Sequence, residues 1–331
     1  MEKQGTILTG DRPTGPLHLG HYVGSLLNRV KLQDKYEQNI LIADMQALTD
    51  NAENPKKVIE NIMELFLDYL AAGLELENNR FCIQSLLPEL NEITMYYLNL
   101  VTLARLKRNP TIKSEMIQKN YKDNVPAGFL IYPVSQAADI TAFKANLVPV
   151  GEDQVPMIEQ TNEIVRCFNR VYGKNILVEC SAILSDAPRL PGTDGKSKMG
   201  KSTNNAIYIK DSSDEISRKI KMMYTDPGHL RVQDPGKVDG NPVFSYLDVF
   251  DPEKDTLDEM KAHYRRGGLG DTVVKARLNE VLQETLRPLR KKRELYGSDR
   301  GQLMSILEKD SQSARETVAD TLKEIRGVIF L

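Results

Sequence analysis

The sequence contains no tryptophan, only three cysteines and only four histidines in 331 residues. The cysteines, at positions 82, 167 and 180, are far apart and match neither a zinc-binding spacing nor a disulfide framework. We therefore expect reduced, buried thiols in a cytosolic protein. The net charge of −2 excludes a global basic field, so a polynucleotide partner must be bound by local patches.

Long hydrophobic runs are also missing. The N-terminus lacks the apolar core of a signal peptide, and no apolar run reaches the length of a membrane-spanning helix. We expect a cytoplasmic location, with neither a membrane nor DNA as a partner. The length allows one large domain and a smaller one.

A Gly/Pro-rich stretch at residues 9–21 follows a short apolar run and precedes apolar residues at helical spacing in 25–32. The order strand, turn, helix is how α/β folds build phosphate sites, because N–H groups at a helix start face the anion. Neither the Rossmann glycine fingerprint nor the P-loop is matched. His18 and His21, three residues apart, would lie on one side of the first turn. A capped helix start would explain the same histidines without a ligand.

A second stretch, residues 188–202, is rich in Pro, Gly, Lys and Ser and has no apolar periodicity. Such a segment predicts a loop of the kind that closes over a ligand. By itself, a Lys/Ser loop is more typical of a solvated connector.

Short apolar runs alternate with helical patterns over the first 210 residues. Strands are predicted at 6–8, 39–43, 81–83, 147–150 and 205–209, with helices at 25–32, 54–72, 91–104, 135–143 and 151–172. This alternation predicts an α/β fold with a doubly wound parallel sheet, whose ligand crevice lies at the carboxyl ends of the strands. The polar, basic segment 105–122 is predicted to be an irregular surface insertion.

From residue 211 the pattern is entirely helical, and we place a domain boundary near residue 210. Basic residues cluster in this second region. They predict either contact with RNA phosphates or an ordinary exposed charged helix face. These residues are Arg265, Arg266, Arg287, Arg290, Lys291, Lys292 and Arg293.

The stretches His18-Leu19-Gly20-His21 and Lys198-Met199-Gly200-Lys201-Ser202 together resemble the paired signatures of the class I aminoacyl-tRNA synthetases. Residues 10–15, 132–140 and 148–154 narrow the resemblance to tryptophanyl-tRNA synthetases of bacterial type. The resemblance implies ATP-dependent activation of L-tryptophan to tryptophanyl adenylate and transfer to tRNA(Trp). It also implies Mg²⁺ carried by ATP, no metal site in the protein, and a homodimer.

The same resemblance implies a Rossmann-like catalytic domain over 1–210, with an insertion at about 105–125. A smaller helical region over 211–331 would bind the tRNA anticodon, and its last helix would pack back on the catalytic domain. The phosphates would be held and the charge of the leaving pyrophosphate stabilised by His18, His21, Lys198 and Lys201. The ATP site would comprise Arg12, Pro13, Thr14, Gly20, His21, Gly151, Glu152, Asp153, Leu190, Lys198, Met199, Gly200, Lys201 and Ser202.

The resemblance assigns Asp139, Tyr132 and Gln136 to tryptophan binding, with Asp139 at the indole N–H and Tyr132 near the ammonium group. The chemistry is consistent, because a buried carboxylate needs a donor. A phenol also donates, so Asp139 alone does not exclude tyrosine, and an ion pair of Asp139 with Lys144 is a further alternative. Three residues depart from the family pattern, namely Arg12, Gln136 and Gly200.

Three other functions are compatible with parts of the sequence. A tyrosine-specific synthetase would share the fold and the motifs. A small-metabolite nucleotidyltransferase would explain residues 1–210 but leave the helical region without a role. A synthetase-like tRNA-binding protein without activity is disfavoured by the intact histidines and lysines of the two motifs.

Overall fold

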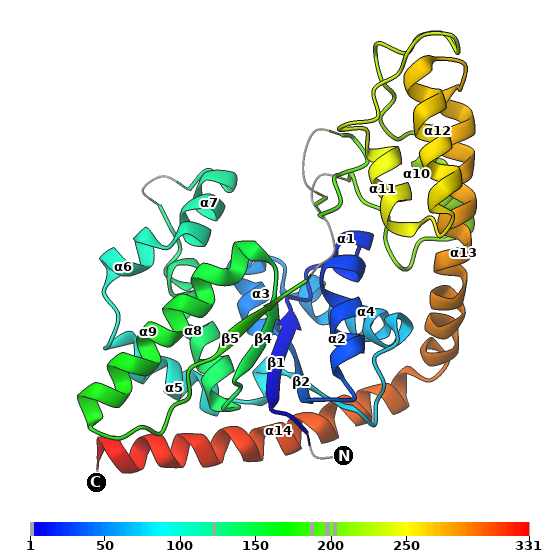
Figure 1. Cartoon of the computed structure of the whole chain (residues 1–331). Coiled ribbons are helices and arrows are strands. Elements are labelled where there is room, and N and C mark those ends of the chain that lie inside the picture. Colours follow the sequence, from blue (N-terminus) through cyan, green and yellow to red (C-terminus); the bar gives the residue numbers. More distant parts are fainter. Residues whose placement is uncertain (1–2, 122–123, 186–188, 196–198, 201–203, 331) are drawn as a thin grey trace.

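The computed structural model describes residues 3–121, 124–185, 189–195, 199–200 and 204–330. Within them a five-stranded parallel sheet has the order β3-β2-β1-β4-β5 (Figure 1). The strands are β1 Thr6–Asp11, β2 Glu37–Ile42, β3 Asn79–Ile83, β4 Leu147–Val150 and β5 Ser181–Leu184. The predicted class, a doubly wound parallel sheet with a helical C-terminal region, is confirmed.

Both faces of the sheet are buried, as parallel sheets require. Ile40 and Ile42 of β2 pack in one hydrophobic cluster with α4, whereas Leu41 lies in a second cluster with Val134 of α8 and Ile164 of α9. Successive side chains of a strand point to opposite faces, so a continuous apolar run covers both. Helix α4 spans Pro55–Ala72, α8 spans Ala127–Ala142 and α9 spans Val155–Tyr172.

Helix α4 shows how the sequence sets an element's ends. The Asn54 side chain accepts a hydrogen bond from the backbone N–H of Lys57, and Pro55 occupies the first helical position. Gly73 ends the helix with φ of 107°, a left-handed conformation that glycine adopts without a Cβ clash. The predicted helix between Asn54 and Gly73 is confirmed.

Three predictions of secondary structure are wrong. The segment predicted to be irregular at 105–122 is largely helical in its described part: α6 covers Leu103–Arg108 and α7 covers Pro110–Gln118, and the Thr102 and Asn109 side chains cap them. The helix predicted at 91–104 is α5, Glu89–Leu98, which ends before Thr102. Residues 205–209 form no strand and make only an isolated bridge, Tyr208 to His18; the fifth strand is β5, which was not predicted.

The remaining helices before residue 210 are short. The turn after β1 leads into α1 Leu19–His21, a π-helical segment η1 Tyr22–Leu26 and α2 Leu27–Leu32. Helix α3 covers Asp44–Asn51, and the 3-10 turns η2 and η3 cover Gln84–Leu86 and Glu152–Gln154.

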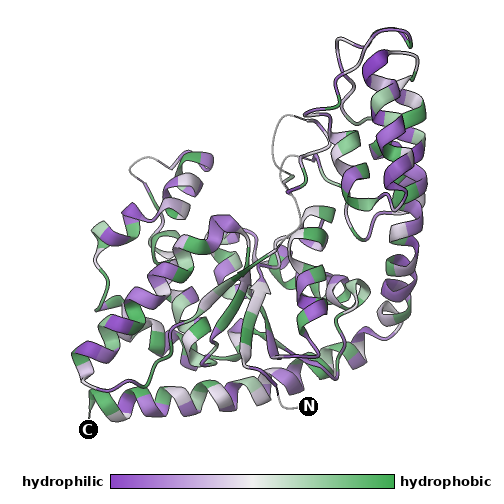
Figure 2. Ribbon diagram, in the orientation of Figure 1, coloured by the Kyte–Doolittle hydropathy of each residue, from purple (hydrophilic) through white to green (hydrophobic). Residues whose placement is uncertain are grey.

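The C-terminal region forms an arm and then returns to the sheet (Figure 1). Its helices are α10 Ser213–Lys221, α11 Pro242–Phe250, α12 Lys254–Arg266, α13 Asp271–Gly297 and α14 Arg300–Ile329. Helix α14 runs along the base of the sheet, where the N–H of Phe81 donates to Asp310 at 3.1 Å and that of Ile83 to Ser311 at 3.0 Å. Hydrophilic and hydrophobic residues alternate along α14 (Figure 2), consistent with one buried stripe.

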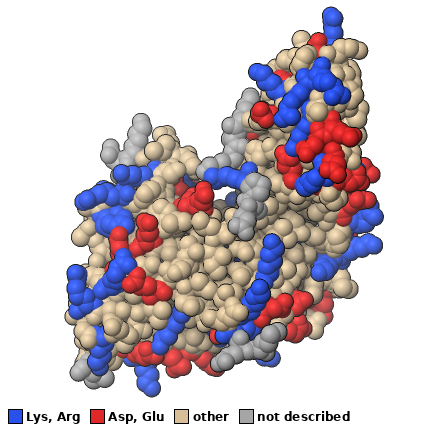
Figure 3. All heavy atoms as spheres, in the orientation of Figure 1, with Lys and Arg blue, Asp and Glu red and all other residues tan. Residues whose placement is uncertain are grey.

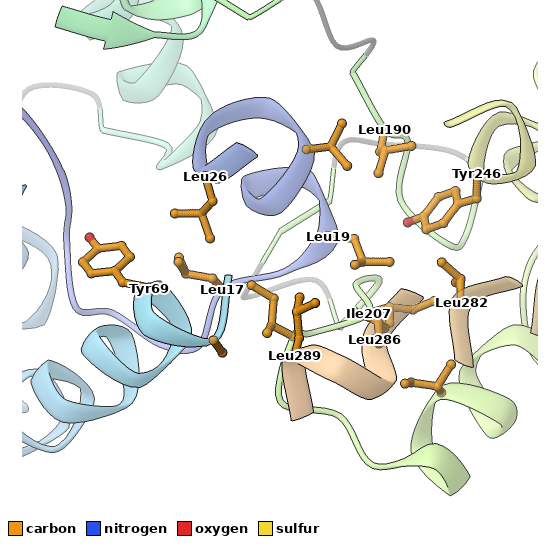
Figure 4. Close-up of a cluster of buried hydrophobic side chains, with 14 of the residues drawn as sticks. Leu17, Leu19, Leu26, Tyr69, Leu190, Ile207, Tyr246, Leu282, Leu286 and Leu289 are labelled. Atoms are coloured by element: carbon orange, nitrogen blue, oxygen red, sulfur yellow. The ribbon is translucent and has the colours of Figure 1, made fainter. Parts of the chain in front are cut away.

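A hydrophobic cluster joins the turn after β1 to the arm (Figure 4). Leu17, Leu19 and Ile207 belong to it together with Leu286 and Leu289 of α13. Apolar contacts therefore cross the boundary predicted near residue 210. No helix in the described part of the chain is long and apolar enough to span a membrane.

The basic residues of the arm do not all face solvent. Arg293 pairs with Glu64 at 2.5 Å, and Arg290 is half-buried and donates to Gln283 at 3.1 Å. Arg265, Arg266, Arg287, Lys291 and Lys292 are exposed. Figure 3 shows basic and acidic side chains interspersed on the visible face of the arm.

Candidate active site

A cavity of about 550 Å³ opens at the carboxyl ends of β1 and β4. Residues 9–12 line it from β1 and residues 148–151 from β4. These two strands are neighbours in the sheet. The strand that follows β1 in the sequence, β2, lies toward one edge, whereas the strand that follows β4, β5, lies toward the other edge. This is the switch point at which doubly wound sheets bind ligands.

His18 and His21 lie together at the cavity, as their spacing predicts. Their ring centroids are 3.8 Å apart, and the His18 backbone N–H donates to Nδ1 of His21 at 3.3 Å. With Nδ1 as the acceptor, neutral His21 carries its proton on Nε2 and can donate it to an anion. The turn is fixed by pairing with a later segment: Leu19 N–H donates to Ile207, and Ile209 N–H donates to Leu17, each at 2.9 Å.

An ion pair that the sequence reasoning missed supports the end of β1. Arg29 and the Tyr69 hydroxyl each donate to the same Asp11 carboxylate oxygen at 2.8 Å. Burial alone raises the pKa of Asp11, but Arg29, His21 and these hydrogen bonds outweigh burial and lower it to about 2. Asp11 is therefore ionised at neutral pH and holds Arg29 beside the cavity.

One stripe of α8 forms the opposite wall of the cavity. Tyr132, Gln136 and Asp139 are separated by four and three residues, a spacing that places them on one helix face, and all three line the cavity. Pro133 lies inside the helix, where it provides no N–H. The three residues predicted for tryptophan binding are thus together.

Asp139 is 2% exposed and accepts hydrogen bonds from two glutamine amides. Gln84 donates to both of its oxygens at 3.0 Å, and Gln46 donates to one at 2.6 Å. Burial raises the pKa of Asp139 to about 7, although both amides act to lower it. The alternative pairing with Lys144 is wrong, because Lys144 binds Glu324 at 2.7 Å.

Tyr132 belongs to a polar network that reaches α7. Its hydroxyl donates to Glu115 at 3.2 Å, and Glu115 also lines the cavity. Burial and the nearby Glu115 raise the pKa of Tyr132. Arg12 lies 5.9 Å from the centre of the Tyr132 ring and pairs with Asp50 at 3.2 Å. Glu115 was not predicted, because its segment was not recognised as a helix.

None of the three cysteines is among the residues that line the cavity. Cys82 and Cys180 are buried, which raises their pKa values to about 12 and about 11, and the half-buried Cys167 departs from the expectation. Among the described residues, no group of three or more His, Cys, Asp or Glu is arranged to hold a metal ion.

Comparison with known proteins agrees with this geometry. Residues 1–287 match the family described as tRNA synthetases class I (W and Y). The chain belongs to this family. A tryptophan–tRNA ligase from Clostridium longisporum is 60% identical over 98% of the chain and 96% of the relative. One from Streptococcus pneumoniae is 54% identical over 98% of the chain and 97% of the relative.

Solved structures of two aminoacyl-tRNA synthetases resemble this fold. The tryptophanyl-tRNA synthetase of Campylobacter jejuni, complexed with ADP and tryptophan, has a TM-score of 0.85 and 28% identity, covering 98% of this chain and 100% of that one. A tyrosyl-tRNA synthetase of Archaeoglobus fulgidus with tyrosine has a TM-score of 0.66 and 21% identity, covering 87% and 90%. The second likeness concerns the fold alone.

The nucleotide residues expected of a class I synthetase divide into three groups. Those that line the cavity are Arg12, Thr14, His21, Gly151, Asp153, Met199 and Gly200. Four further residues are described by the structure but do not line the cavity, namely Pro13, Gly20, Glu152 and Leu190. Lys198, Lys201 and Ser202 lie outside the described residues.

Leu190 illustrates the second group, because it is 5% exposed and packs near Leu19 and Tyr246 (Figure 4). In this structure its side chain packs in the hydrophobic cluster next to the His18–His21 turn, and its assignment to the ATP site stays a prediction.

Proposed function

We propose that this cavity is where the chain activates L-tryptophan with ATP and passes the tryptophanyl group to tRNA(Trp). The carboxylate of tryptophan attacks the α-phosphorus, the bond to the β-phosphate oxygen breaks, and pyrophosphate leaves. A ribose hydroxyl of tRNA then attacks the adenylate carbonyl, releasing AMP and a proton. The observation that carries the proposal is one cavity with a histidine pair on one wall and a buried carboxyl on the other.

The histidine turn binds the triphosphate. His21 Nε2–H is a donor whose orientation is fixed by the hydrogen bond at Nδ1, so little reorganisation is needed as charge develops. The lysines Lys198 and Lys201 meet the same phosphates when their loop approaches, since Met199 and Gly200 between them already line the cavity. Mg²⁺ arrives with ATP and offsets part of the phosphate charge.

Helix α8 binds tryptophan. Asp139 accepts the indole N–H, while Gln46 and Gln84 hold the carboxyl group in place. Tyr132 lies two helical turns before Asp139, about 10 Å along the axis, and faces the ammonium group. A ligand bound this way presents its carboxylate toward the histidine turn, and fixing that geometry can lower the barrier by roughly 7–11 kcal/mol.

The arm binds tRNA through its exposed cations. Arg265, Arg266, Arg287, Lys291 and Lys292 remain candidates, whereas Arg290 and Arg293 are engaged by neighbouring side chains. The overall charge of −2 makes such local contacts the source of phosphate affinity.

The decisive experiment is ATP–pyrophosphate exchange with each of the twenty amino acids, followed by charging of total tRNA. We expect exchange with tryptophan and charging of tRNA(Trp) only. Exchange with tyrosine would favour the tyrosine-specific alternative, and exchange with no amino acid would favour a nucleotidyltransferase or a binding protein.

A further inference from the structure

Asp68 of α4 is a completely buried carboxylate outside the cavity, with an exposed fraction of 0%. One of its oxygens accepts the backbone N–H of Leu17 at 2.8 Å. The other oxygen accepts no hydrogen bond from the described residues, but Nε of Arg293 lies 3.3 Å from it. A buried charge requires such a partner, because its desolvation is otherwise uncompensated.

The hydrogen bond from the Leu17 N–H to Asp68 is made directly before the histidine turn, so a change in it would move that turn. Leu17 directly precedes His18, which is the N-cap residue of α1 and lines the cavity. The Leu17 carbonyl accepts a hydrogen bond from the Ile209 N–H, so both backbone polar groups of Leu17 bind partners distant in sequence. The position of the Leu17 backbone therefore determines where the His18 and His21 side chains lie in the cavity.

Arg293 reaches Asp68 from the arm. It lies on α13 with its side chain 11% exposed, and it also donates to Glu64 at 2.5 Å. Glu64 in turn binds Arg300 of α14 at 2.9 Å, and Lys210 lies 3.8 Å from it. Helix α4, the segment after the Lys/Ser loop and both long C-terminal helices thus meet at one cluster of charges.

We propose that Asp68 is a positioning residue for the histidine turn, and that Arg293 holds it in place and so links the arm to the catalytic step. The proposal rests on the proposed role of that turn in phosphate binding. Asp68 touches no substrate and acts through Leu17. Because tRNA is proposed to bind the arm, a shift of the arm would reach the histidines through Arg293, Asp68 and Leu17.

The pKa of Asp68 agrees with this arrangement. Burial raises it to about 6 even though Arg293, the Leu17 N–H and Lys210 lower it, and Glu64 raises it further. Removing Arg293 therefore leaves a carboxylate that binds a proton or turns away from Leu17. A protonated carboxyl is a weaker acceptor for the Leu17 N–H than a carboxylate, and turning away breaks that hydrogen bond, so the histidine turn is held less firmly in both cases.

The test compares Arg293→Met with Arg300→Met in the full chain. Both remove one cation that binds Glu64, but only Arg293 also contacts Asp68. We expect Arg293→Met to slow single-turnover adenylate formation about tenfold or more, while the Kd for tryptophan stays within about twofold. Arg300→Met should keep the wild-type rate, and Arg293→Lys should recover most of it.

Protein stability is separated from positioning by measuring thermal unfolding of each variant. If Arg293→Met does not fold, Asp68→Asn/Arg293→Met replaces it, because no buried charge is then left unpaired. We expect the double variant to fold and to be slow. A wild-type rate in the variant that folds, or an equal loss in Arg300→Met, overturns the proposal.

His21→Ala distinguishes this link from the role of the turn itself. If His21→Ala keeps the wild-type rate, the phosphate-binding role of the turn is wrong. If His21→Ala is slow while Arg293→Met is not, the turn functions as proposed and only the link to the arm is refuted.

Discussion

At the scale of single residues, the most informative group is the Asp139 carboxyl. It is nearly fully buried, and among the described residues its hydrogen-bond donors are the side-chain amides of Gln46 and Gln84. Both amides belong to elements far from it in the sequence, on α3 and η2. A carboxyl held by neutral donors keeps acceptor capacity for a ligand N–H.

Replacing Asp139 should change which ring the site accepts. The wild type should reject a tryptophan analogue with sulfur in place of the indole N–H, by up to roughly 10⁴–10⁵-fold, because the carboxyl would lose its donor. Asp139→Ala should bind tryptophan more weakly and lose most of this discrimination. Ligand fluorescence measures both affinities, since the chain has no tryptophan of its own.

Asp139→Asn is the matched control for that prediction, because it keeps one acceptor oxygen and should retain part of the discrimination. Equal discrimination by the wild type and by Asp139→Ala would show that Asp139 does not recognise the ring nitrogen.

Asp139 should also make stability depend on pH. Its pKa is about 7 in the folded chain against 3.8 for the free side chain, so the folded state holds the proton more tightly. The stability it contributes is complete below pH 3.8 and is lost as the pH rises through 7. Relative to wild type, Asp139→Asn should therefore gain a few kcal/mol in unfolding free energy between about pH 4 and about pH 8. Urea unfolding measures this gain, and parallel pH curves for the two proteins would contradict it.

At the scale of elements, the helical segments after β1 contain two glycines in different surroundings, Gly20 in α1 and Gly24 in η1. A Cβ on Gly20 would lie 2.9 Å from the His18 ring and 3.0 Å from the Met199 methyl group, whereas a Cβ on Gly24 would meet nothing within 4 Å. Gly20→Ala should therefore displace a catalytic ring or the approaching loop and slow adenylate formation at least tenfold. Gly24→Ala should keep the rate and add up to about 1 kcal/mol of stability, since alanine favours helix. Equal rates in the two variants would mean that the close packing at Gly20 is unimportant.

The lysines of the Lys/Ser loop should bind the phosphates more tightly in the transition state of adenylate formation than in the ground state. Lys201→Ala is expected to lower the single-turnover rate of adenylate formation by roughly 10²–10³-fold, with tryptophan affinity nearly unchanged. Rapid-quench measurement of adenylate tests this, and Lys174→Ala, which removes an exposed lysine elsewhere, is the control. An unchanged rate of adenylate formation in Lys201→Ala would show that this loop has no catalytic role.

The elements that could be predicted from the sequence are those whose residue pattern lies within a few neighbouring positions. Four of the five strands are apolar runs bounded by turns, and the two histidines share one helical turn, so both could be recognised from spacing. Strand β5 is a short, half-exposed edge strand, which weakens its pattern. Gln46, Gln84 and Asp68 could not be found in this way, because their partners lie 93, 55 and 51 residues away.

At the scale of the whole molecule, a homodimer remains a prediction. Large apolar side chains are exposed on α5, α6 and α7, namely Met95 at 61%, Leu103 at 63% and Ile117 at 79%. Covering such residues with a second copy would remove apolar area from water. Sedimentation at micromolar concentration should give about twice the chain mass of 37.4 kDa, and Leu103→Glu should shift it toward the monomer. A wild-type mass of 37.4 kDa would rule out the dimer.

The contact of α14 with β3 has a consequence for synthesis of the chain. Strand β3 is an edge strand whose N–H groups at Phe81 and Ile83 are satisfied by Asp310 and Ser311. The ribosome must add 228 residues after Ile83 before Ser311 exists, which takes roughly 10–45 s at about 5–20 residues per second. For that time the nascent chain carries an open strand edge, the feature from which chains pair with one another. Protection of the sheet against aggregation is therefore among the last things the growing chain acquires.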